Sequence, residues 1–206
     1  GNKLSIHLRG LQDSLPPFDK KYVEQAFIES FGEDYKKKFK KIDEPIAAAS
    51  IAQVHKAIIK SDGKSQTVAV KILRPNIEGK IKKDLNDFYL AAKILEKFSS
   101  EARRLRVLEV VKTLEESLSM EVDLRLEAAA QSEIIDNTKN DDFIEIPKIF
   151  WDLTSKNILT TQWVNSHSSK DLIKIKKKNI NFNSVGENIM KTFLILAIRD
   201  GFFHAD

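Results

Sequence analysis

The sequence predicts an α+β fold in which a small antiparallel sheet is combined with long helices. Residues 52–60 alternate between apolar and polar side chains, and residues 66–73 form a second run rich in β-branched residues. Asp62 and Gly63 lie between the two runs, which favours an antiparallel hairpin. Long segments with apolar residues every three or four positions follow, a spacing typical of amphipathic helices.

Composition is that of a globular domain and excludes several functions. The chain has 206 residues, of which 42% are hydrophobic, enough to build a sizeable core. The absence of cysteine excludes a disulfide framework and thiolate chemistry, and the four histidines lack zinc-ligand spacing, so no structural zinc site is expected. The net charge is only +4 and no aromatic–basic interleaving is present, so no nucleic-acid partner is expected.

Two helices are predicted before the hairpin. Asp19 is a suitable N-cap for a helix that ends near Phe31, and Gly32 supplies the stop signal. Residues 35–42 are rich in lysine, and we expect a short solvated helix there, ahead of Pro45.

After the hairpin, the pattern predicts two long helices, two strands and two further helices. The first long helix should bury one apolar face, made of Ile81, Leu85, Phe88, Ala92 and Leu95. The second should run from about residue 105 to 135, with an apolar stripe of Val107, Val111, Leu114 and Leu118. The remaining elements are expected at residues 143–150 and 158–164 (strands), 171–179 (a basic helix) and 183–200 (a helix with Ile189, Phe193 and Leu196 buried, ended by Gly201).

The second strand of the hairpin carries the sequence Val68-Ala69-Val70-Lys71. Alternation along a strand puts Lys71 on the same face as Ala69. A lysine on a small sheet, paired with a carboxylate from a following helix, is how protein kinases hold ATP phosphates. Taken alone, the motif also fits an ordinary surface lysine at the end of a strand.

The motifs around this lysine occur in an order found in one family. They are LQDSLPP at 11–17, AAASIAQVH at 47–55, VAVKILRP at 68–75, the acidic residues between 121 and 127, and HAD at 204–206. Together they resemble the UbiB/ADCK family of atypical kinase-like proteins over essentially the whole chain. The resemblance implies a protein-kinase-like fold, with an N-terminal lobe containing an antiparallel sheet, family-specific helices and the start of the helical C-terminal lobe.

The resemblance also implies roles for individual residues. Lys71 would contact the α and β phosphates of ATP, Glu127 would hold Lys71, and Asp206 would be the catalytic-loop base. Glu121 and Asp123 correspond to the acidic motif of the family and are placed with the nucleotide. The segment that would cover the nucleotide consists of Ile46, Ala47, Ala48, Ala49, Ser50, Ile51, Ala52, Gln53 and Val54.

Two of these assignments have alternatives. Alanine restricts the backbone more than glycine, so an alanine-rich loop should hold nucleotide in a more constrained way; a helix start or tight strand packing is the other interpretation. On one continuous helix Asp123 and Glu127 would share a face, whereas Glu121 would point roughly 200° from Asp123. The three carboxylates would then not meet one ligand unless the helix is distorted, and a solvated acidic face with Arg125 as a partner is the alternative.

The expected domains are a helical extension at residues 1–42, a kinase-like N-terminal lobe at 43–165 and the start of a C-terminal lobe at 166–206. The resemblance implies ATP and Mg²⁺ as cofactors, with kinase or ATPase activity supporting ubiquinone biosynthesis; the alternative is a catalytically silent nucleotide-binding scaffold regulating a membrane-associated lipid-biosynthesis complex. Because the chain stops at Asp206, these residues alone are expected to be inactive.

Expected partners are ubiquinone-biosynthesis enzymes or lipid intermediates. The expected location is the bacterial cytoplasm, at the cytoplasmic face of the inner membrane. The lysine runs at 36–41 and 174–178 fit either a solvated face or attraction to anionic lipid.

Overall fold

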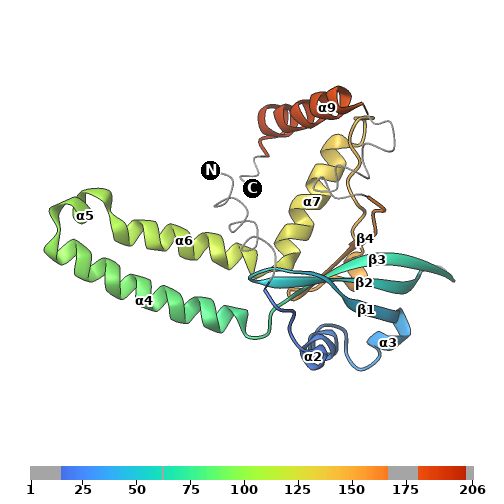
Figure 1. Ribbon diagram of the computed structural model, residues 1–206, viewed down its shortest axis with the longest axis horizontal. Helices are drawn as coiled ribbons and strands as arrows, with labels where there is room; N and C mark the ends of the chain where they lie inside the picture. Colours follow the sequence, from blue (N-terminus) through green and yellow to red (C-terminus); the bar gives the residue numbers. More distant parts are fainter. Residues whose placement is uncertain (1–14, 62, 167–180, 203–206) are drawn as a thin grey trace, which may run out of the picture.

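The computed structural model describes residues 15–61, 63–166 and 181–202, and over these residues the chain has the expected α+β fold (Figure 1). The N-terminal part contains α2 (Lys20–Phe31), α3 (Tyr35–Lys38), β1 (Phe39–Ala48), β2 (Ala52–Ser61) and β3 (Lys64–Leu73). It is followed by α4 (Ile77–Phe98), α5 (Ser100–Leu105), α6 (Val107–Glu121) and α7 (Leu124–Thr138). The last elements are a 3₁₀ turn η1 (Trp151–Leu153), β4 (Ile158–Gln162), α9 (Phe182–Leu194) and a π-helical turn η2 (Ile195–Arg199).

The four strands form one antiparallel sheet in the order β1-β2-β3-β4. The predicted hairpin of β2 and β3 is confirmed, with an uninterrupted register from Ala52 opposite Leu73 to Ser61 opposite Lys64. Gly63 adopts a φ of 75° at the turn, a conformation that glycine reaches without steric cost. In Figure 1, α2 and α7 lie on opposite sides of this sheet.

Alternation along β3 divides the sheet into two different faces. Val68, Val70 and Ile72 are completely buried on the side of α2, whereas Ala69 and Lys71 lie on the other side and keep part of their surface exposed. The predicted placement of Lys71 beside Ala69 is therefore confirmed.

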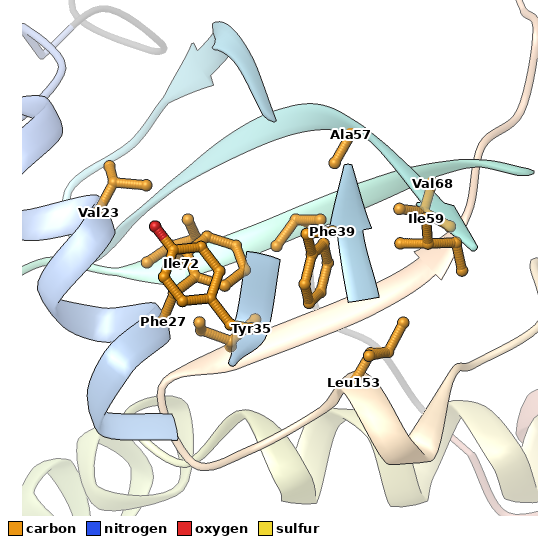
Figure 2. Packing of buried hydrophobic residues seen from close by; sticks show 11 residues of the cluster. Val23, Phe27, Tyr35, Phe39, Ala57, Ile59, Val68, Ile72 and Leu153 are labelled. Carbon is orange, nitrogen blue, oxygen red and sulfur yellow. The ribbon is translucent and has the colours of Figure 1, made fainter. Parts of the chain in front are cut away.

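An aromatic cluster fixes α2 and α3 against the first face of the sheet. Phe27 is fully buried, with ring centroids 5.1 Å from Tyr35 and 4.8 Å from Phe39 (Figure 2). The predicted ends of α2 are confirmed, because Asp19 accepts a hydrogen bond from the Lys21 amide and Gly32 follows the last turn with a φ of 75°.

The prediction of a solvated helix over residues 35–42 is wrong. The helix stops at Lys38, and Phe39 begins β1, which continues across the domain boundary expected at residue 42. Phe39 is 3% exposed, so burial of its ring against the sheet outweighs the tendency of the lysine-rich stretch to continue as a helix.

A single helix over residues 105–135 is also wrong. Arg106, with a φ of 50°, separates α5 from α6, and the chain breaks again at Val122 before α7 begins. At this second break the Asp123 side chain caps α7, and the Leu124 amide bonds to the Lys156 carbonyl. These bonds replace those that a continuous helix would make.

The helices α4 and α6 pack together along a narrower stripe than predicted. Leu85 and Ala92 are buried against Val111, but Phe88 and Leu95 are each 51% exposed. The contact between the two helices centres on Leu85 and Ala92, and Tyr89 packs beside them in place of Phe88 and Leu95. On the facing helix, Val107 and Leu118 pack at the contact and Leu114 is 40% exposed.

The C-terminal elements differ from prediction in their extent. Of the strand expected at 143–150, the structure shows a single bridge from Ile149 to Thr161, and β4 is shorter than expected. The helix over 182–194 begins at an Asn181 cap rather than at residue 183. Its predicted buried face is exposed among the described residues (Ile189 63%, Phe193 46%), while Leu196 is half-buried.

The basic helix expected at 171–179 lies outside the described residues. No described helix is both long and apolar enough to cross a bilayer.

Replacing Phe27 by alanine should lower the free energy of unfolding by about 3–5 kcal/mol, because the ring is fully buried and its cavity cannot refill. Chemical denaturation measures this change. Phe98→Ala, at a ring that is 78% exposed, is the matched control and should cost much less. Equal losses in the two variants would contradict the assigned core.

Candidate functional site

The candidate site is built around an ion pair between β3 and α7. The Lys71 Nζ donates to the Glu127 Oε2 at 2.7 Å, and the two side chains are 28% and 43% exposed. Lys71 lies opposite Val54 on β2 and Leu159 on β4, so it stands in the middle of the sheet. The structure thus brings together the two residues that the resemblance assigns to each other.

Apolar packing positions the helix that carries the glutamate. Leu124 and Ala128, both completely buried, flank Glu127 in the sequence of α7. They pack against the sheet through Ala52, Leu73 and Leu159. Because this contact fixes the first turns of α7, the Glu127 carboxylate stays within reach of Lys71.

The alanine-rich segment forms the connection between β1 and β2. Ala47 pairs with Val54 and Ala48 pairs with Gln53, so only residues 49–51 lie outside the strands. Residues 49–51, Ala-Ser-Ile, end the alanine run that starts at Ala47, and we call them the alanine-rich turn. Its backbone hydrogen bond runs from the Ala49 amide to the Ala52 carbonyl. Of the two alternatives considered for this segment, a helix start is contradicted by the two strands, whereas strand packing agrees with the pairing of Ala47 and Ala48.

The segment predicted to cover nucleotide does not present all its side chains to one face. Ile46 and Ser50 are exposed, whereas Ala52 and Gln53 are 3% and 1% exposed. The Gln53 Oε1 accepts from the Phe18 amide at 2.9 Å, on the side of the sheet away from Lys71. The Gln53 side chain therefore lies on the face of the sheet opposite to the ion pair.

Glu121 and Asp123 are separated by the break between α6 and α7. Glu121 is the exposed last residue of α6, and Asp123 caps α7. The Arg125 Nη2 lies 2.6 Å from the Asp123 carboxylate, and this hydrogen bond lowers the pKa of Asp123 below its usual value. The partner considered from the sequence is thus present. No contact joins either carboxylate to Lys71 among the described residues.

The catalytic aspartate and the magnesium site that the resemblance implies are not located by the described residues. Asp206 lies outside the described residues, as do His204 and the lysines at 174–178. In the parts of the chain that are described, no three histidine, aspartate or glutamate side chains converge as metal ligands do.

A contact that sequence analysis missed joins α7 to the segment before Gly201. The Arg199 Nη1 lies 3.0 Å from the Asp141 Oδ2, and its Nη2 donates to the Asn137 carbonyl at 3.0 Å. Its Nε also pairs with Asp200 at 2.7 Å. The Arg-Asp pair directly before a helix-ending glycine is the feature of the sequence that could have indicated this contact. α7 is thus held at one end by the sheet and at the other by the chain that leads toward Asp206.

The opposite face of the sheet holds a buried histidine beside a hollow of about 430 Å³ between β1, α2 and α3. His55 is 3% exposed; its Nδ1 lies 2.8 Å from the Asp43 carbonyl and its Nε2 lies 2.8 Å from the Gln53 Nε2. Since the Gln53 amide nitrogen can only donate, the imidazole is neutral, with its proton on Nδ1. Burial lowers the pKa of His55.

A small antiparallel sheet with a lysine paired to a helix glutamate is the arrangement of the N-terminal lobe of a protein kinase. Residues 10–206 match the ABC1 atypical kinase-like domain. The chain therefore belongs to the ABC1 atypical kinase-like family, and the resemblance to UbiB proteins is confirmed.

Several relatives carry the name "Probable protein kinase UbiB". The protein from Marinobacter nauticus is 37% identical over 200 residues, which are 97% of this chain and 36% of the relative. The proteins from Pseudomonas paraeruginosa and a Shewanella species are each 34% identical, over 98% of this chain and 38% and 37% of their own lengths. The chain thus spans a little over a third of the length of these relatives.

The Lys71–Glu127 pair should contribute little to folding stability, because both side chains are partly exposed to water. A double-mutant cycle of Lys71→Met and Glu127→Gln should give a coupling free energy of unfolding below about 1 kcal/mol. Denaturant titration of the four proteins measures it. A coupling of several kcal/mol would instead assign the pair a structural role.

Burial of neutral His55 should make stability depend on pH. Its pKa is lowered from the usual 6.5, so the unfolded chain takes up the proton first. This contribution is fully present above pH 6.5 and is lost as the pH falls through that value toward the lower pKa of the folded state. The wild type should therefore lose more stability between pH 8 and pH 5 than His55→Gln does. Parallel pH dependences would contradict the assignment.

Proposed function

We propose that this chain is the nucleotide-binding part of an ATP-dependent kinase-like protein. The observation that carries the proposal is the 2.7 Å contact between Lys71 on β3 and Glu127 on α7. In protein kinases such a pair fixes a lysine amine for contact with nucleotide phosphates. Membership of the atypical kinase-like family supports the same assignment.

Each residue has a physical task in this proposal. Glu127 holds the Lys71 amine on the exposed face of the sheet, so that its charge is oriented before the α and β phosphates arrive. The alanine-rich turn, at the end of β1 and β2 nearest Lys71, covers the nucleotide. Asp206 receives or orients the proton of the acceptor hydroxyl. Bound Mg²⁺ would neutralise charge on the phosphates.

The biological role proposed for the whole protein is support of ubiquinone biosynthesis at the cytoplasmic face of the bacterial inner membrane. The names of the relatives support kinase-like chemistry in a UbiB protein. The proposed partners are quinone-biosynthesis enzymes or lipid intermediates, together with the membrane surface.

A second candidate function is a nucleotide-binding scaffold that regulates a lipid-biosynthesis complex without transferring phosphate. The alanines at 47–49, where a typical kinase has glycines, favour it, because they restrict the backbone more than glycines do. Turnover of ATP by the longer protein that contains these residues distinguishes the two functions. Turnover that Asp206→Asn abolishes supports the kinase or ATPase, whereas binding without such turnover supports the scaffold.

Nucleotide binding is the first test of either function. Replacing Lys71 by alanine should weaken ATP binding by about tenfold or more, because a charge-assisted contact to phosphate is lost. Isothermal titration measures the affinity. Lys60→Ala is the matched control, since Lys60 is an exposed lysine at the far end of β2 on the same face, and it should bind ATP like the wild type. Equal affinities in all three proteins would contradict the assigned site.

A further inference from the structure

Arg74 holds the alanine-rich turn through both its side chain and its backbone. The Arg74 Nε donates to the Ala49 carbonyl at 2.9 Å, and the Arg74 amide donates to the Ile51 carbonyl at 2.8 Å. Two of the turn's three carbonyl oxygens are thus bound to one residue. Arg74 directly follows β3, three positions after Lys71, so the strand that carries the phosphate-binding lysine also carries the group that holds the turn.

The amides of the turn are less fully hydrogen-bonded than its carbonyls. The Ala49 amide is used within the turn, while the amides of Ser50 and Ile51 have no hydrogen-bond partner among the described residues. Ser50 is exposed, so its N–H group is open to solvent or to a ligand. One carbonyl of this segment is bound to a guanidinium and another to a backbone amide, and two successive amides are unpaired, so the segment is suited to binding an anion.

The turn reaches this arrangement without the backbone freedom of glycine. Among the described non-glycine residues, only Asn76 and Arg106 have a positive φ, so every residue of the alanine-rich turn has an ordinary backbone conformation. A glycine-rich loop can reorient its peptide groups when phosphate arrives, but the Cβ atoms of Ala49, Ser50 and Ile51 limit this movement. The orientation of the turn must therefore be set in advance by groups outside it.

The same guanidinium joins the turn to the chain that precedes α2. The Arg74 Nη2 donates to the Pro16 carbonyl at 3.1 Å, and the guanidinium lies over the Phe18 ring at 5.9 Å. The Phe18 amide in turn donates to Gln53, two residues beyond the turn. Residues 16–18 and the alanine-rich turn are thus braced against each other.

We propose that Arg74 is the positioning residue of the phosphate site: it fixes the carbonyls of the alanine-rich turn so that the Ser50 and Ile51 amides are free to bind the phosphates of the nucleotide. This inference rests on the proposed nucleotide-binding function and adds which backbone groups recognise the phosphates. Arg74 acts through the turn, without touching the nucleotide itself. Through the hydrogen bond to the Pro16 carbonyl, the segment before α2 also helps to hold Arg74 in place.

The test compares the affinities for ATP and for adenosine, which lacks phosphates. Arg74→Ala should weaken ATP binding about tenfold and leave adenosine binding within about twofold, because only the phosphate contacts depend on the turn. Arg74→Lys keeps the charge, but a single ammonium cannot bind both the Ala49 and the Pro16 carbonyl as the guanidinium does, so it should show a smaller loss of the same kind. Isothermal titration of the longer protein that contains these residues supplies the affinities, and thermal unfolding verifies that each variant is folded.

Arg103→Ala is the matched control. The Arg103 Nη1 also donates to two backbone carbonyls, of Glu96 at 2.8 Å and Lys97 at 3.2 Å, but at the tip of the helical hairpin. The Arg103→Ala variant should bind ATP and adenosine with the affinities of the wild type. If Arg74→Ala fails to fold, Arg74→Lys alone decides.

The outcomes separate this inference from the function on which it rests. A wild type that binds no ATP overturns both. ATP binding that depends on Lys71 but is unchanged in the Arg74 variants overturns the role of Arg74 and leaves the nucleotide site intact. An equal loss of ATP and adenosine affinity also overturns it, since the effect would then be a general disturbance of the site.

Discussion

The arrangement of the site depends on a constraint between two elements far apart in the sequence: Lys71 on β3 must meet Glu127 on α7. The pair is too exposed to stabilise the fold by much, so other interactions have to bring the elements together. They are the burial of Leu124 and Ala128 against the sheet and the capping of α7 by Asp123. The acidic residues at the start of α7 therefore have separate tasks, one as a helix cap and one as the partner of the lysine.

β3 illustrates how one strand can serve both folding and function. Its residues on one face complete the aromatic and aliphatic core beneath α2, while Lys71 on the other face remains accessible. Arg74, immediately beyond the strand, braces the turn between β1 and β2. Because the core immobilises the strand, a lysine and an arginine three residues apart are held in fixed relation to one another and to the turn.

Local patterns predicted much of this architecture from the sequence. Alternation gave the hairpin and the face of Lys71, and capping residues gave the ends of α2. The failures involve contacts between distant segments. Phe39 is a strand residue because it packs on Phe27, and the break after Glu121 is supported by a bond from Leu124 to Lys156. Neither partner is visible in a local window, and the contacts of Arg74 with Ala49 and Pro16 depend on distant partners in the same way.

Chemical labelling of Lys71 tests the central claim most directly. An acyl phosphate of ATP transfers its acyl group to an amine that lies beside the bound phosphates, and mass spectrometry identifies the modified lysine. The account predicts acylation concentrated at Lys71 and suppressed by an excess of unmodified ATP. Labelling spread over the many surface lysines, at a level that ATP does not change, would contradict a phosphate site at the Lys71–Glu127 pair.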